Sequence, residues 1–361
     1  ISTDELRGEL GRPDLQVVDV RPIDAYNGWR LGGEVRGGHV RGARTLPAKW
    51  AGYLDWIEIV RDKGIRPEHD VVVYGYDEEE SRAVAGRFER AGFGTPRLYG
   101  GFVDEWAADD GLPMDRLARY RNLVPASWVR ELVDGGTPPE HDGRPFVVCH
   151  AHYRNPDDYR EGHLPGAVPL DTRRLESPET WNRRSPDEVE RALEELGITR
   201  DTTAVLYGRF SAPDGSDPFP GASAGQLAAF RCAFIMLWAG VEDVRVLNGG
   251  VQSWTDAGFD LETADREPEP VEDFGARIPG RPELAVDLDE AKQILEDPDR
   301  NLVSVRSWPE YIGEVSGYDY IEEKGRIPGS VFGDCGSDAY HMENYRNLDH
   351  TTREFHEVEA G

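Results

Sequence analysis

Two short apolar runs stand out along the chain because polar loops flank each of them. Residues 71–74 and 204–207 are apolar at every position. Continuous runs of this length are typical of strands that are covered on both faces, as in parallel sheets. A loop and a predicted helix follow each run, at about residues 81–91 and 224–239. The alternation of strands and helices predicts an α/β fold with helices on both sides of a parallel sheet.

A second pattern closes two blocks of domain size. Residues 92–106 and 240–254 each contain a β-like stretch, a glycine pair, an apolar residue and then a tryptophan. Repetition of a long pattern within one chain indicates two copies of one structural unit.

A third pattern, a short turn, occurs three times and extends the repeat toward the end of the chain. The turn has the form Gly-His-x-x-Gly-Ala, and its third copy has Arg in place of His and Ser in place of Ala. Each copy follows a strand-like stretch and a tyrosine: Tyr26 precedes residues 38–43, Tyr159 precedes residues 162–167, and Tyr311 precedes residues 325–330. No strand, loop and helix follow the third turn, so we expect only the first part of a third unit.

These repeats divide the chain into two whole blocks and part of a third. We expect domain 1 at residues 1–114, domain 2 at residues 115–265, and the N-terminal part of domain 3 at residues 284–361. Residues 266–283 are polar and rich in proline, which predicts a linker. A length of 361 residues agrees with two or three domains.

The composition of the chain disfavours several classes of binding partner. The net charge is −28 and the isoelectric point about 4.7, which disfavours nucleic acids and anionic membrane surfaces. The sequence contains no apolar run of about 18 residues that would cross a bilayer. Its three cysteines fit neither a disulfide framework nor a metal-binding motif. So few cysteines favour a cytoplasmic location, and export stays open because the chain starts at Ile1 without Met.

The ordered set of motifs resembles rhodanese domains of the thiosulfate sulfurtransferase superfamily. The set is a strand ending in Asp-x-Arg, a tyrosine, the Gly-His turn, a strand, loop and helix, and the glycine pair with its tryptophan. Block three adds residues 306–311, 316–321, 336–338 and 341–343, which are similar to bacterial three-domain thiosulfate sulfurtransferase-like proteins. The resemblance implies tandem rhodanese-like domains, each a three-layer α/β/α sandwich.

The resemblance also implies a chemistry. Rhodaneses move a sulfane sulfur from thiosulfate or a related donor to a thiophilic acceptor through a cysteine persulfide, and no cofactor is expected. The cysteine lies in the loop after the central strand, where a helix N-terminus lowers the thiol pKa and backbone amides surround the persulfide. The expected partners are a small sulfur-containing anion and, as a further option, a protein that accepts the sulfur.

Neither complete block has a cysteine at that position. The central strand of block one is followed by Gly75 and four carboxylates at residues 77–80, and that of block two is followed by Gly208. Consecutive carboxylates would repel thiosulfate and raise the pKa of a thiol. We therefore expect domains 1 and 2 to be non-catalytic and the nucleophilic cysteine to follow Gly361. Arg209 is interpreted as a surface-loop residue, with an anion or partner contact as the alternative.

The remaining candidate residues have mostly structural interpretations. Cys232 lies within a predicted helix and Cys149 ends a strand on the face opposite His150, so both are assigned to the core. Cys335 is assigned to a loop. The histidines of the repeated turn, His39 and His163, are assigned to structural hydrogen bonds, and Arg326 to the same place in block three.

One residue, Arg306, is predicted to bind substrate. It follows the first strand of block three, and the resemblance implies that an arginine near there lines an anion site. Glu310, however, stands where some two-domain rhodaneses have a substrate-binding arginine, which leaves the substrate open. The first hypothesis is a sulfurtransferase that acts through domain 3. The alternative is an inactive rhodanese tandem that binds a partner or an anion. Phosphatase-like variants of the fold need Cys-x5-Arg after a strand, and that motif is absent.

Overall fold

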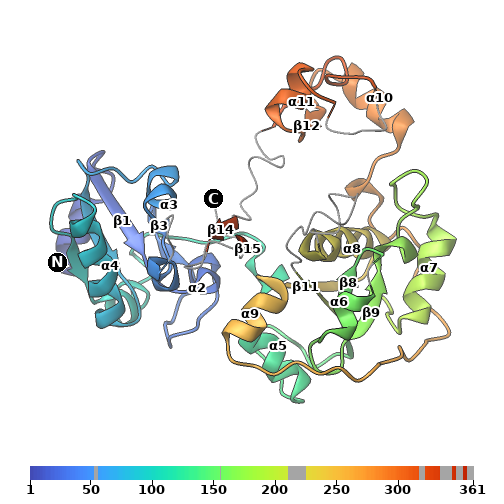
Figure 1. Ribbon diagram of the computed structural model, residues 1–361, viewed down its shortest axis with the longest axis horizontal. Coiled ribbons are helices and arrows are strands. Elements are labelled where there is room, and N and C mark those ends of the chain that lie inside the picture. Colours follow the sequence, from blue (N-terminus) through green and yellow to red (C-terminus); the bar gives the residue numbers. More distant parts are fainter. Residues whose placement is uncertain are drawn as a thin grey trace.

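The computed structural model describes residues 1–52, 56–154, 156–209, 225–316, 322–333, 344–346 and 353–355. Two parallel sheets flanked by helices form the larger part of the molecule, and a smaller third part follows them along the chain (Figure 1). The predicted α/β class and the tandem arrangement are confirmed. The predicted boundaries at residues 114, 265 and 283 stay predictions.

Domain 1 contains a four-stranded parallel sheet in the order β3-β1-β4-β5. Its strands are β1 Leu15–Asp19, β3 Arg44–Thr45, β4 Asp70–Tyr74 and β5 Arg97–Tyr99, and a separate antiparallel pair joins β2 His39–Val40 to β6 Met114–Asp115. Its helices are α1 Thr3–Glu9, α2 Ile23–Asn27, α3 Trp56–Asp62 and α4 Glu78–Arg90, with η1 Ala48–Gly52 and the single π-turn η2 Phe102–Trp106.

The apolar run of β4 serves two cores at once. Val71 and Val73 belong to the core under α3 and α4, whereas Val72 and Tyr74 belong to the core on the other face with Phe102. Side chains alternate between faces along a strand, so a strand that is covered on both faces must be apolar at every position. The predicted strand at residues 71–74 is therefore confirmed, together with its cause.

Domain 2 contains a five-stranded parallel sheet in the order β7-β11-β10-β8-β9. Its strands are β7 Leu123–Val124, β8 Phe146–His152, β9 Val168–Asp171, β10 Thr203–Gly208 and β11 Asp243–Leu247. Its helices are α5 Ala126–Val133, α6 Asp157–Arg160, α7 Pro186–Glu195, α8 Gly225–Ala239 and α9 Gly250–Asp256, with η3 Tyr120–Asn122 and η4 Thr172–Arg174. Helices α7 and α8 cover one face of the sheet, and α5 and α9 cover the other.

The first two domains interlock through a tryptophan. Trp29 of domain 1 is buried in the domain 2 core, edge-on to Tyr120 and near Trp128. Its indole N–H donates to the carbonyl of Leu123 at 2.7 Å. A buried hydrogen bond of 2.8 Å from Asn248 to Asp24 also crosses between the domains. Because they share a core, the first two domains pack as one unit rather than as two domains joined only by a linker.

The segment predicted as a linker, residues 266–283, is docked rather than free. Phe274 is fully buried and Ile278 nearly so, and both belong to the core beneath α7 and α8. The backbone N–H of Phe274 donates to the Glu194 carboxylate at 3.1 Å, and its carbonyl accepts from Arg200. The assignment of residues 266–283 as a linker stays a prediction. Two apolar side chains among many polar ones are enough to hold this segment, called here the strap, against domain 2.

The third part is smaller and more open. It contains α10 Leu288–Glu296, α11 Trp308–Ile312 and a parallel pair of two-residue strands, β12 Val303–Ser304 and β13 Val331–Phe332, after η5 Pro282–Leu284. A separate antiparallel pair joins β14 Asn344–Arg346 to β15 Arg353–Phe355. The paired residues Val303 and Val331 are about half exposed. Within the described part of this unit, no third strand covers the other edge of β12.

Across the residues that the structure describes, no helix combines the length and the apolar character that spanning a bilayer requires.

The docked strap predicts a large loss of stability on truncation of its anchor. Phe274→Ala removes a fully buried ring, so we expect domain 2 to lose about 3–5 kcal/mol. Glu272→Ala, at an exposed position of the same strap, should stay within about 0.5 kcal/mol of the parent. Urea unfolding followed by tryptophan fluorescence measures both. Equal stability of the two variants would mean that the strap is not part of the core.

Candidate functional site

A hydrogen bond between a tyrosine and the repeated turn recurs in all three parts of the chain. The tyrosine hydroxyl donates to the carbonyl of the last residue of the turn: Tyr26 to Ala43 at 2.8 Å, Tyr159 to Ala167 at 3.0 Å, and Tyr311 to Ser330 at 3.1 Å. We call this contact, with the stacking described next, the tyrosine clasp. It ties the helix after the first strand to the start of the neighbouring strand.

The second residue of each turn completes the clasp. His39 and His163 stack on their tyrosine rings with centroids 3.6 and 3.8 Å apart, and each Nδ1–H donates to the carbonyl of the same tyrosine. In the third part, Arg326 does both: its guanidinium lies 4.5 Å from the Tyr311 ring centroid and donates to the Tyr311 carbonyl at 3.3 Å. The predicted structural role of these residues is confirmed.

The glycine that opens each turn is held by an arginine. The guanidinium donates to the glycine carbonyl in every copy: Arg21 to Gly38 at 2.7 Å, Arg209 to Gly162 at 2.5 Å, and Arg306 to Gly325 at 3.0 Å. These glycines have φ values of +116°, +151° and +96°, which a residue with a Cβ rarely adopts. Glycine is therefore required at the head of the turn.

In domain 2 the arginine that binds the turn glycine follows a different strand from that in domain 1. The registers β1–β4 and β8–β10 pair Asp19 with Tyr74 and His150 with Tyr207, so His152 stands where domain 1 has Arg21. Arg209, which follows β10, reaches the vacant glycine carbonyl and also donates to the carbonyl of Asp158. Its interpretation as a surface-loop residue was wrong. The signal that could have revealed its role was the missing arginine at position 152.

In domain 1 the position expected for a nucleophile is closed. A Cβ built on Gly75 would lie 2.7 Å from Val20 Cγ2 and 2.8 Å from Ser81 Oγ. Ser81 in turn donates to the carbonyl of Asp77, whose carboxylate caps α4 by accepting from the N–H of Glu80. The helix N-terminus that would stabilise a thiolate therefore already carries a carboxylate.

A buried ion-pair network fills the space beside Gly75. Arg21 is fully buried and pairs with Asp19 at 2.6 Å and with Glu34 at 3.4 Å. Tyr74 donates to Asp19 at 2.6 Å, and Tyr76 donates to Glu34. One guanidinium faces two carboxylates, so the network is net negative and has no capacity left for an anionic sulfur donor.

In domain 2 the same place holds neutral histidines. His150 and His152 are buried, and within the described residues neither nitrogen of His150 nor Nδ1 of His152 has a hydrogen-bond partner. Burial lowers the pKa of His150 to about 3, and the neighbouring His152 and Arg209 act in the same direction. Sequence inspection missed this feature because a buried histidine without partners leaves no trace in spacing or composition.

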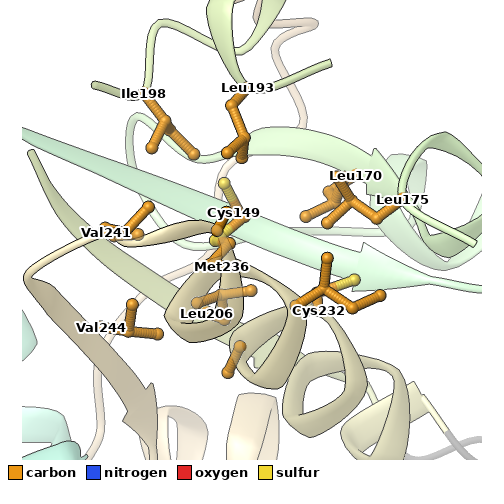
Figure 2. Close-up of a cluster of buried hydrophobic side chains, with 14 of the residues drawn as sticks. Cys149, Leu170, Leu175, Leu193, Ile198, Leu206, Cys232, Met236, Val241 and Val244 are labelled. Carbon is orange, nitrogen blue, oxygen red and sulfur yellow. The ribbon is translucent and has the colours of Figure 1, made fainter. Parts of the chain in front are cut away.

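Neither described cysteine is suited to carry sulfur. Cys149 and Cys232 are fully buried in the core between the domain 2 sheet and α8, among aliphatic side chains (Figure 2). Burial raises the pKa of Cys149 to about 12, which leaves almost no thiolate near neutral pH. Their assignment to the core is confirmed, whereas Cys335 lies outside the described residues. Among the described side chains no group of three or more His, Cys, Asp or Glu could hold a metal ion.

Arg306 covers the carbonyl of the turn glycine as Arg21 does in domain 1, but its other partners differ. Besides the Gly325 carbonyl it binds the Glu310 carboxylate at 3.1 Å and the carbonyl of Ser316. Glu310 also closes a capping box with Ser307 at the start of α11. The role of Arg306 as a substrate ligand stays a prediction.

Comparisons with known proteins agree with this architecture. The rhodanese-like domain pattern matches residues 2–109 and 151–257. The thiosulfate sulfurtransferase YnjE of Escherichia coli is 34% identical over 364 residues, which span all of this chain and 78% of that protein.

Solved structures give a higher similarity. The anaerobic ergothioneine biosynthesis enzyme of Chlorobium limicola, solved with its natural substrate trimethyl histidine, is 59% identical with a TM-score of 0.91. The match covers 98% of this chain and 82% of that one. A structure of EanB with a cysteine persulfide, in a tetrahedral intermediate state with ergothioneine, has the same identity and TM-score and is covered to 84%.

The closed position at Gly75 predicts opposite effects of two glycine substitutions. Gly75→Ala forces a Cβ against Val20 and Ser81, so we expect a loss of about 1–3 kcal/mol. The matched control is Gly86→Ala within α4, where the nearest atom is the Arg90 guanidinium at 3.5 Å and the gain should be about 0.5–1 kcal/mol. Thermal unfolding measures both. A neutral Gly75→Ala variant would show that an open cradle exists there.

The buried histidine predicts loss of stability in acid. His150 is harder to protonate in the folded state, so stability falls as the pH drops from its ordinary pKa of 6.5 toward about 3. The loss amounts to roughly 2 kcal/mol at pH 5. His150→Phe should remove this part of the pH dependence in urea titrations between pH 7 and pH 4.5. Cys149→Ala, on the opposite face of β8, should lower stability equally at every pH. Parallel pH profiles for wild type and His150→Phe would contradict the assignment.

Proposed function

Because this chain belongs to the rhodanese family, we propose that the intact protein is a sulfurtransferase that carries a sulfane sulfur as a cysteine persulfide of domain 3. One observation carries the proposal. The 59% identity to an ergothioneine biosynthesis enzyme extends over 98% of this chain, and therefore includes the third part. At that level of identity, a shared reaction class is the simplest expectation.

The state of the first two domains supports the same assignment. Gly75 is packed shut in domain 1, Gly208 stands at the equivalent place in domain 2, and the two described cysteines are buried in the core. Domain 3 keeps the tyrosine clasp and the arginine on its glycine carbonyl, so the strand pair beside it is held in the orientation seen in the other domains. We propose that domains 1 and 2 are a scaffold for domain 3.

We further propose trimethyl histidine as the acceptor and ergothioneine as the product. Solved structures that are 59% identical to this chain contain these molecules: one of EanB contains ergothioneine, and one of the Chlorobium limicola enzyme contains trimethyl histidine. YnjE is named for thiosulfate and is 34% identical. The predicted acceptor class, a thiophilic molecule, is thereby replaced in the proposal by a methylated amino acid. Thiosulfate or a related sulfur anion remains the proposed donor. The position of the nucleophilic cysteine after Gly361 stays a prediction.

The test uses the intact protein and mass spectrometry. Incubation with thiosulfate should add the mass of one sulfur atom, and peptide mapping should place it on a cysteine after Gly361. Addition of trimethyl histidine should remove the sulfur and yield ergothioneine, while cyanide should yield thiocyanate. The control is Cys149→Ala, which should load sulfur as well as wild type because that thiol is buried and protonated at neutral pH.

Three outcomes would contradict parts of the proposal. Sulfur on Cys149, Cys232 or Cys335 would overturn the assignment of the site. Persulfide formation and thiocyanate without any ergothioneine would overturn the acceptor. Absence of any sulfur loading would favour the alternative, an inactive tandem that binds a partner or an anion.

A further inference from the structure

Four arginines converge on one depression at the edge of domain 2. The depression has a volume of about 390 Å³ and is lined by Arg173 and Arg174 of η4, by Arg184 just before α7, and by Arg191 on α7. We call it the arginine pocket. The protein as a whole carries a net charge of −28, so its composition does not predict a cluster of four guanidinium groups.

Three carboxylates also line the arginine pocket, and each already has its own arginine. The pairs are Asp171 with Arg173 at 2.6 Å, Glu195 with Arg174 at 2.5 Å, and Glu188 with Arg184 at 3.0 Å. Arg191 has no hydrogen bond or ion pair within the part of the chain that the structure describes. The pocket is therefore one positive charge in excess, and that charge is held by an uncommitted guanidinium.

Two of the three carboxylates, Asp171 and Glu188, also make hydrogen bonds to groups outside a guanidinium. Asp171 accepts from the backbone N–H of Arg173 and from two nitrogens of its guanidinium, at 2.6–3.0 Å. Glu188 is the third residue of α7 and closes a capping box with Ser185. Each of the three paired guanidinium groups has five N–H donors and uses only some of them to bind its carboxylate. The remaining donors can bind an anion.

The position in the fold is one where ligands bind. Asp171 ends β9 and is paired in register with His152 at the end of β8. The arginine pocket thus includes the carboxyl end of β9, and open parallel sheets hold their ligands at the carboxyl ends of their strands.

We propose that the arginine pocket binds a small divalent oxyanion, and that thiosulfate is its ligand in the protein. The identity of the anion rests on the proposed sulfur transfer, whereas the binding of an oxyanion rests on the pocket itself. Arg191 supplies the free charge, and the other three arginines supply planar donors suited to tetrahedral oxyanions. Domain 2 would then bind the sulfur donor, although it has no nucleophile at position 208.

The test is calorimetric titration of the chain with thiosulfate, with sulfate, phosphate and acetate as comparison anions. Arg191→Gln should weaken thiosulfate binding about tenfold or more, because one charge-assisted contact is lost. Glu188→Gln should tighten it several-fold, since glutamine can keep the capping box while one negative charge disappears. The matched control is Arg82→Gln, an exposed helical arginine of domain 1 that pairs with Glu78, and it should leave affinity unchanged.

The outcomes separate this proposal from the sulfur-transfer proposal. No binding of any divalent anion by wild type, or equal losses for Arg191→Gln and Arg82→Gln, would overturn the oxyanion site. Equal affinity for thiosulfate, sulfate and phosphate would support the site and overturn thiosulfate as its dedicated ligand. Sulfur loading of the intact protein is measured separately, so a pocket that binds in a protein that loads no sulfur would leave the oxyanion site standing and overturn only the transfer reaction.

Discussion

The tyrosine clasp is the contact on which each unit of this protein depends. A parallel sheet requires the chain to leave the end of one strand, cross the sheet and return to lay the next strand beside the first. In all three parts a tyrosine on the crossing helix binds the turn that begins the return. The turn also needs a glycine with positive φ and a ring or guanidinium that stacks on the tyrosine. Because these requirements are local, the chain repeats them even where the parts around them differ.

The differences between the units show which contacts can be supplied by residues at different places in the sequence and which cannot. The glycine carbonyl is covered by an arginine in every copy. That arginine follows β1 in domain 1 and β12 in domain 3, whereas in domain 2 it follows β10. A buried carbonyl needs a donor, but the donor need not have a fixed place in the sequence. The nucleophile position is different, because Gly75 is tightly packed and the adjoining helix N-terminus is capped by Asp77. A cysteine at position 75 would therefore need changes in several neighbouring side chains as well.

The domains are also joined more firmly than a tandem repeat requires. Trp29 of domain 1 completes the core of domain 2, and the strap around Phe274 completes the opposite core before the chain reaches domain 3. Domain 3 is thus attached to a strap with a fixed path rather than to a free tether. Such an arrangement suits the proposed role of domains 1 and 2 as a scaffold, and the arginine pocket lies on the second of these domains.

The sequence by itself determined the α/β class, the repeat, the position of both central strands, and the absence of a cysteine at positions 75 and 208. These features follow from local rules: apolar runs of four, glycine where φ is positive, and the order of motifs. Only the tertiary structure decided that Arg209 replaces the arginine missing at position 152, that the proline-rich segment is part of the core, and that four arginines meet at one edge of domain 2. Each of these depends on residues far apart in the chain meeting in space, and neither spacing nor composition records such a meeting.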